Sequence, residues 1–206
     1  MPLFNSHNIV NSNLLIWNIT ESESELKKSI NLSSIVKSRL DEIKSCSQRK
    51  QFLGIQNLLK ILNIKNKELS YNANGKPILS NNYISITHSF DYCGVVVSSK
   101  KIGLDIEKLR PKILNITKKF ISDRELDLFT NDNVIDVTKI WTIKESVYKA
   151  FGFSGIDFKN NIIVKTIDKK FNNAEVKIFK NDIIEFYNVE ITNFSQYICS
   201  IANKRI

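Results

Sequence analysis

Residues 102–107 alternate strictly between apolar side chains and small or acidic ones, and this alternation constrains the fold more than any other segment of the chain. A period of two predicts a β-strand with one buried face, so Asp105 and Glu107 project from the same side of it. Adjacent carboxylates repel each other unless a shared proton, water or a cation relieves the charge, and a divalent ion with oxygen ligands commonly does so. A solvated strand edge would have the same spacing, so the pair alone leaves both interpretations open.

Residues 140–151 carry apolar side chains at steps of three or four, which predicts an amphipathic helix that ends near Gly152. Trp141, Glu145 and Lys149 then lie one turn apart on a single stripe of the helix. An ordinary Glu–Lys pair on a solvated face would show this spacing as well. The aromatic residues beside these charges favour a stripe that is partly enclosed.

Four short segments in a fixed order give a more specific indication. They are Gly75-Lys76-Pro77, Ile86-Thr87-His88-Ser89, Gly103-Leu104-Asp105-Ile106-Glu107, and Trp141-Thr142-Ile143-Lys144-Glu145-Ser146 with Lys149 beyond it. In this order and at these separations they resemble the 4′-phosphopantetheinyl transferases of the larger, surfactin-synthetase-activating type. The resemblance extends from the region of Arg49 to Lys149, about half of the chain.

The resemblance implies a fold of the α+β class. Family members of this type are monomers of two similar halves related by a pseudo-twofold axis. Each half is a small, mainly antiparallel sheet packed with helices, and the active site lies in the cleft between the halves. We expect the halves to be residues 1–100 and 101–206, because a polar and basic patch near residues 99–101 separates two apolar strands.

Local patterns agree with a fold of this kind. In the first half we expect a strand over 8–19, one or two helices over 23–45 that begin after the capping pattern Ser22-x-x-Glu25, a helix over 47–63, a turn at Asn74-Gly75, and strands near 83–88 and 93–98. In the second half, a strand over 101–107 and a short helix after Ser122-x-x-Glu125 precede the helix of Trp141. Further strands are expected over 161–166, 175–179, 183–191 and 196–202, and they should be antiparallel because their connections are too short for crossover helices.

The resemblance assigns the charged residues of the second half to a magnesium site. Asp105, Glu107 and Glu145 match the Mg²⁺ ligands of the family, and the ion would grip the pyrophosphate of coenzyme A. Lys149 would contact the same phosphate and steady the leaving 3′,5′-ADP. Glu145 also matches the proposed general base, although a metal-bound water could take that role, because a metal-bound carboxylate is a weak base.

Residues of the first half match the positions with which the family binds coenzyme A. Thr87 and His88 correspond to residues that hold a phosphate, and Lys76 to a lysine near the adenine and the 3′-phosphate. Arg49 and Lys50 begin a run that resembles the basic helix of the family. The chain departs from that pattern with Lys50 and Gln56 at arginine positions, and a lysine offers a point charge where arginine offers a planar fork.

The resemblance implies an enzyme that transfers the 4′-phosphopantetheine arm of coenzyme A to a serine of an apo acyl or peptidyl carrier protein. Alternatives are a nucleic-acid-binding module and a family member that binds coenzyme A without transferring anything. A Mg²⁺-dependent nuclease or phosphotransferase would also explain the carboxylates, but it gives no account of the Gly-Lys-Pro and Thr-His-Ser segments. Fatty-acid, polyketide and nonribosomal-peptide carriers all stay open as substrates.

The formal net charge of +9 suits either phosphates or an acidic carrier protein as a partner. We do not expect nucleic acid as the partner, because the lysines are spread along the chain and no recognised binding motif accompanies them. A signal peptide and a spanning segment are not expected either, since the first residues lack a basic region and no apolar run reaches about 20 residues. The sequence therefore predicts a cytoplasmic protein with no membrane partner.

Overall fold

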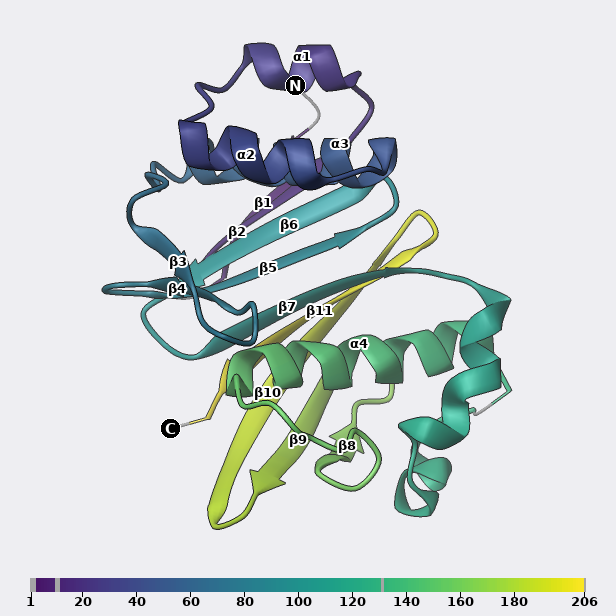
Figure 1. The fold of residues 1–206 in the computed structure, drawn as a ribbon. Helices are drawn as coiled ribbons and strands as arrows, with labels where there is room; N and C mark the ends of the chain where they lie inside the picture. The colour runs from purple at the N-terminus through teal and green to yellow at the C-terminus, as the bar shows by residue number, and fades with distance from the viewer. Residues whose placement is uncertain (1–2, 10–11, 131, 206) are drawn as a thin grey trace. The chain divides into compact units, whose positions relative to one another are not determined.

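The chain divides into two compact units, Met1–Ser99 and Lys100–Ile206, in a computed structural model that describes residues 3–9, 12–130 and 132–205 (Figure 1). Both units combine helices with antiparallel sheet, so the predicted α+β class is confirmed. No helix among these described residues has the length and apolar character needed to cross a membrane.

The first unit is built on a four-stranded antiparallel sheet. Its strands, in spatial order, are β1 (Leu3–Ile9), β2 (Ser12–Asn18), β6 (Tyr92–Ser98) and β5 (Tyr83–Ser89). Helix α3 (Cys46–Ile61) packs on β6 and β2, and helix α1 (Glu23–Lys28) packs on α3. Gly54 permits the close approach of α3 to the sheet, because a Cβ there would lie 2.7 Å from the Cys93 sulfur.

One prediction for the first unit needs correction. The single strand expected over 8–19 is wrong, because β1 and β2 form a hairpin whose residues 10 and 11 lie outside the described part of the chain. The polar composition of residues 5–8 concealed β1, since apolar alternation was the signal for a strand. The one or two helices expected over 23–45 are confirmed as two, α1 and α2 (Ser34–Glu42), and the Ser33 side chain caps the second. The predicted turn at Gly75 joins a short hairpin of β3 (Leu69–Tyr71) and β4 (Pro77–Leu79).

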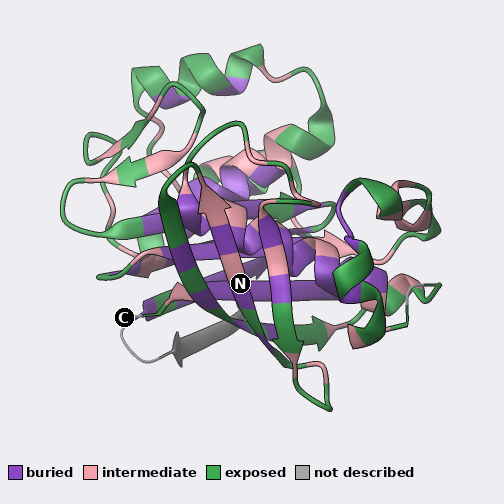
Figure 2. Cartoon of the chain, turned by 90° about the horizontal axis from the view of Figure 1, so that it is seen from below, coloured by how far each residue is buried: buried purple, intermediate pink, exposed green. Residues whose placement is uncertain are grey.

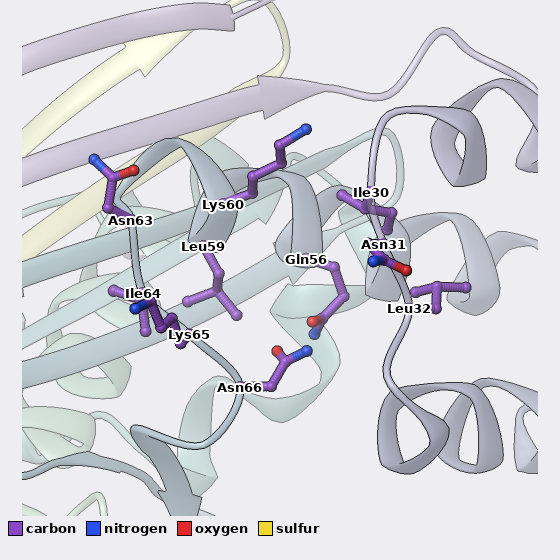
Figure 3. Close-up of a pocket in the computed structure, with 10 residues that line it drawn as sticks. All are labelled: Ile30, Asn31, Leu32, Gln56, Leu59, Lys60, Asn63, Ile64, Lys65 and Asn66. Carbon is purple, nitrogen blue, oxygen red and sulfur yellow. The ribbon is translucent and has the colours of Figure 1, made fainter.

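A pocket of about 460 Å³ lies in the first unit between the connection from α1 to α2 and the C-terminal end of α3 (Figure 3). Aliphatic side chains, carboxamides and two lysines line it: Ile30, Asn31, Leu32, Gln56, Leu59, Lys60, Asn63, Ile64, Lys65 and Asn66. None of the residues predicted to bind coenzyme A is among these lining residues.

The second unit is built on a five-stranded antiparallel sheet covered on one face by a long helix. In spatial order the strands are β7 (Ile102–Lys108), β11 (Tyr197–Lys204), β10 (Ile183–Phe194), β9 (Asn173–Lys180) and β8 (Ile162–Ile167). The 3₁₀ helices η1 (Pro111–Lys119) and η2 (Asp123–Leu128) lead into α4 (Val134–Phe151), which ends at Gly152 in the left-handed conformation with φ of 80°. The antiparallel strands and the helix predicted for this half are confirmed.

The two units share a pattern of connections. In the first unit, β2 leads through helices α1 to α3 to later strands, of which β6 pairs with β2. In the second, β7 leads through η1, η2 and α4 to later strands, of which β11 pairs with β7. In both units, therefore, a strand that precedes the helices is paired with a strand that follows them.

The core of the second unit lies between α4 and its sheet. The helix buries Val137, Ile140, Ile143 and Val147, each with essentially no exposed surface. Buried and exposed residues alternate along β9 and β10, and this alternation can be followed along the strands in Figure 2. One face of the sheet therefore packs on α4, which fixes the height of the helix above β7.

Candidate functional site

The position of α4 over β7 depends on Gly103. A Cβ on this residue would lie 1.8 Å from the carbonyl oxygen of Ser146 and 2.7 Å from the backbone nitrogen of Ala150. Only glycine permits so close an approach of a strand to a helix. Because side chains alternate along a strand, Asp105 and Glu107 project from the same face as Gly103, toward α4.

Asp105 is held by Lys149 of the helix. The lysine Nζ lies 2.7 Å from Asp105 Oδ1 and 3.1 Å from the carbonyl oxygen of Leu104, and it donates to both. Asp105 is only 4% exposed, so its charge lies well inside the protein, beside a cation from the facing element. The predicted strand is confirmed, and Asp105 is more deeply buried than a solvated edge would allow.

Glu107 is joined to the same helix through Trp141. The indole Nε1 lies 3.4 Å from Glu107 Oε1 and donates to it. The indole ring is enclosed by Phe120, whose ring centroid lies 5.0 Å away edge to face, and by Phe158, which stacks at 5.5 Å. The enclosed stripe expected from the aromatic residues is therefore present.

Glu145 lies between these two contacts along the helix. Burial raises its pKa to about 7, Asp105 and Glu107 add to the rise by charge repulsion, and Lys149 opposes it. Three carboxylates therefore lie within electrostatic reach of one another with one lysine among them. Such a group carries surplus negative charge when all three acids are ionised, and it would attract a cation.

The carboxylates of Asp105, Glu107 and Glu145 are suitable ligands for a hard divalent cation, but their side chains do not converge on one point. Among the residues that the structure describes, no group of three or more acidic, histidine or cysteine side chains is already arranged to hold a metal ion. The lysine ammonium on Asp105 supplies the positive charge in this arrangement. Carboxylate oxygens are nevertheless the ligands that Mg²⁺ prefers. A cation bound beside Glu145 would favour its ionised form and so lower its raised pKa. The predicted magnesium site stays a prediction.

Lys144, which the sequence reasoning left without a role, forms a fully buried ion pair with Glu125. Its Nζ lies 2.8 Å from Glu125 Oε2, and neither side chain is exposed. Burial lowers the pKa of Lys144, and the charge of Glu125 opposes that shift. The predicted capping pattern is present, because Glu125 accepts hydrogen bonds from the backbone and hydroxyl of Ser122. The missed signal was the helical period, since Lys144 occupies a core position four residues after Ile140.

Arg49 of the first unit forms hydrogen bonds that hold helices of this unit together. Its guanidinium forms a bidentate pair with Glu23, with N to O distances of 2.9 and 2.7 Å, and donates to the carbonyl oxygens of Leu40 and Ile43. It thereby ties α1, α2 and the residue that ends α2 to α3. Its role toward coenzyme A stays a prediction, and Lys50 beside it is half-buried.

The other predicted residues of the first unit lie in the turn before β4 and on β5. Lys76 is half-buried, and its backbone nitrogen donates to Asn72 Oδ1. Thr87 is buried whereas His88 is exposed, as expected for consecutive residues that point to opposite faces of a strand. Whether these residues act together with Asp105, Glu107, Glu145 and Lys149 stays a prediction.

Comparison with known proteins connects the second unit to one family. Residues 101–202 match the model of the 4′-phosphopantetheinyl transferase superfamily. The chain is 29% identical over 156 residues to 4′-phosphopantetheinyl transferase gsp of Aneurinibacillus migulanus, covering 71% of this chain and 63% of that protein. It is 36% identical over 80 residues to a 4′-phosphopantetheinyl transferase of Bacillus subtilis, covering 37% of this chain and 36% of that protein. The chain thus spans less than two thirds of either relative, and the resemblance indicated by its motifs is confirmed.

Proposed function

The second unit of this chain belongs to the 4′-phosphopantetheinyl transferase superfamily, and on that premise we propose that the protein transfers 4′-phosphopantetheine from coenzyme A to a serine of an apo carrier protein. The observation that carries this proposal is the cluster of Asp105, Glu107, Glu145 and Lys149, which lies wholly inside the matched region. In the reaction the serine oxygen bonds to the β-phosphorus of coenzyme A, the bridging bond to the α-phosphate breaks, and 3′,5′-ADP leaves.

Asp105, Glu107 and Glu145 would hold Mg²⁺. When bound there, the ion would neutralise the charge that develops on the pyrophosphate as the bridging bond breaks. Hydrogen bonds already fix two of the three carboxylates: Lys149 donates to Asp105, and Trp141 donates to Glu107. Preorganised charges of this kind are more effective in a buried site than in water.

Lys149 would bind the leaving phosphate. Its ammonium donates to Asp105 Oδ1 within the carboxylate cluster, so a phosphate bound at the cluster would come within reach of the ammonium, with a phosphate oxygen as the acceptor. It would balance negative charge on 3′,5′-ADP as that group departs.

Glu145 would take the proton of the serine. Its pKa of about 7 lies near neutral pH, and a carboxylate with this pKa is a stronger base than a glutamate with the usual pKa of 4.5. Positive charge bound beside it would lower that pKa and weaken it as a base, so positioning and charge neutralisation carry more of the rate than proton removal does.

The remaining elements of the proposal concern the partners. Lys50, Lys76, Thr87 and His88 would bind coenzyme A, with a smaller share for Arg49 because Glu23 engages its guanidinium. The carrier protein would be acidic, in keeping with the charge of +9. We further propose a monomeric, cytoplasmic enzyme without a nucleic-acid or membrane partner.

Mass spectrometry of carrier proteins tests the proposal. The protein is incubated with coenzyme A, Mg²⁺ and a panel of apo acyl and peptidyl carriers, and a carrier that gains the mass of phosphopantetheine supports transfer and names the substrate class. Asp105→Asn should abolish the gain, whereas Asp136→Asn, which removes a carboxylate from the first turn of α4, should not. A folded protein that modifies none of the carriers would count against the proposal. Salt-sensitive binding to oligonucleotides, without Mg²⁺-dependent binding of coenzyme A, would favour a nucleic-acid-binding module instead.

A further inference from the structure

A buried hub around Lys144 and Glu125 connects four segments of the second unit to α4. The Lys144 ammonium donates to Glu125 and to the carbonyl oxygens of Phe120 and Phe158, at 2.8, 2.6 and 3.0 Å. Glu125 in turn accepts from the backbone nitrogen of Val164 at 2.8 Å, in addition to its bonds with Ser122. All three donors of the ammonium and both oxygens of the carboxylate are thus engaged, which is the condition for a charged pair to be stable in a protein interior.

The hub lies next to the carboxylate cluster through the residues whose backbone it binds. Phe120 and Phe158, whose carbonyls accept from Lys144, are the two residues whose rings enclose Trp141. The Trp141 indole is the group that donates to Glu107. A continuous path of contacts therefore runs from the buried ammonium through two aromatic walls to one carboxylate of the candidate site.

We propose that Lys144, paired with Glu125, is a positioning residue: it holds the aromatic enclosure that aims the Trp141 indole at Glu107. Its significance for turnover rests on the proposed function. Lys144 has no route to substrate of its own, because its side chain is fully buried and its three donors are used inside the protein. Its neighbour Glu145 faces the cluster, so one helix turn supplies a lysine for support and a glutamate for chemistry.

The indole N–H resonances in a ¹H–¹⁵N spectrum test the positioning directly. The chain has two tryptophans, so Trp141 gives one resonance and Trp17, in the first unit, gives an internal control. In Lys144→Met we expect the Trp141 resonance to shift and its hydrogen to exchange faster with water, while the Trp17 resonance stays in place. Lys139→Met is the matched control, because Lys139 is also a buried lysine of α4 that donates to a backbone carbonyl, that of Phe171.

The proposal is overturned if the Trp141 resonance does not move in folded Lys144→Met, or if Lys139→Met moves it equally. Removing one partner of a buried pair can prevent folding, so the double variant Lys144→Met with Glu125→Gln, which leaves no unpaired charge, is measured as well. If both variants unfold while Lys139→Met folds, the pair is a requirement for folding and the positioning role is rejected.

Kinetics provide the second readout. In a folded Lys144 variant we expect kcat to fall about 100-fold, as for a misplacement of about 1 Å in an active site, with KM for coenzyme A nearly unchanged. A KM effect without a kcat effect would contradict a role in aiming Glu107. If the wild-type protein transfers nothing, the proposed function fails, and the indole resonances still decide whether Lys144 positions Trp141.

Discussion

Replacing Gly103 with alanine should separate the helix from the strand that together carry the candidate site. The added carbon would lie 1.8 Å from the Ser146 carbonyl oxygen, whereas real Cβ atoms essentially never come within 3.0 Å of a neighbour. The two nearest atoms, the Ser146 carbonyl oxygen and the Ala150 backbone nitrogen, both belong to the backbone of α4. No side-chain rotation can therefore relieve the contact, and α4 must move away from β7 by roughly 1 Å. Overpacking of this kind costs about 3 kcal/mol or more of the free energy of unfolding.

Gly75→Ala is the matched control for this substitution. Gly75 has a φ of 76°, and a Cβ there would meet nothing within 4 Å, so its replacement costs only the strain of the left-handed conformation, about 1 kcal/mol. Urea unfolding of both variants, followed by circular dichroism, compares the two costs. If Gly103→Ala loses no more stability than Gly75→Ala, the close approach of α4 to β7 is not as described.

The displacement should also be visible in activity. A shift of about 1 Å moves Lys149 and Glu145 away from Asp105, and misplacements of this size can cost about 100-fold in rate. Carrier modification by Gly103→Ala should therefore fall far more than its folded fraction does, measured at a temperature where circular dichroism shows the variant folded. A rate in proportion to the folded fraction would mean that the chemistry does not depend on this spacing.

Three further predictions concern individual carboxylates. Asp105→Ala and Glu107→Ala should each nearly abolish carrier modification while the circular dichroism spectrum stays that of the wild type, and turnover at the wild-type rate would remove these residues from the proposed chemistry. The pKa of Glu145 is raised from 4.5 to about 7, so its contribution to stability is present below pH 4.5 and is lost as pH rises through about 7. In a chelating buffer, the free energy of unfolding of the wild type should therefore fall by about 2 to 3 kcal/mol more than that of Glu145→Gln between about pH 5 and about pH 8. Urea unfolding at a series of pH values measures this, and the same pH dependence in both proteins would contradict it. For Glu185, burial opposes ionisation, but hydrogen bonds from Lys101, Lys204 and Tyr187 outweigh it and lower the pKa to about 2. Its contribution of about 3 kcal/mol to the free energy of unfolding is present above pH 4.5 and is lost as pH falls toward about 2. The stability of Glu185→Gln, measured by acid unfolding, should therefore fall less over this pH range than that of the wild type.

The second unit could be predicted from sequence more fully than the first, for local reasons. Its strands alternate in burial and are rich in β-branched residues, and Gly152 ends α4 in the left-handed conformation, so each element carries its own signal. Strand β1 has no such signal, because its pairing with β2 is made by backbone groups whatever the polarity of its side chains.

The sequence indicates which charged residues share a face, but not what supports them. Spacing along a strand puts Asp105 and Glu107 on one face, and spacing along a helix puts Glu145 and Lys149 on one stripe, whereas their assignment to one site comes from the family resemblance and stays a prediction. The partners of Lys144 and Arg49 could not be found in this way. Glu125 and Glu23 are distant in sequence and become neighbours only through tertiary packing, so no local period reports them.

The pairing of β7 with β11 brings the two ends of the second unit together. Ile102 lies opposite Asn203, and the Lys204 nitrogen donates to the carbonyl oxygen of Lys101. A short linker from residue 204 to residue 101 would therefore close this unit into a ring without disturbing its sheet, and new ends could be opened at the exposed turn around Asn181 and Asp182. A circularly permuted half of this kind would keep both β7 and α4 intact, and with them the strand-to-helix contact on which the carboxylate cluster is built.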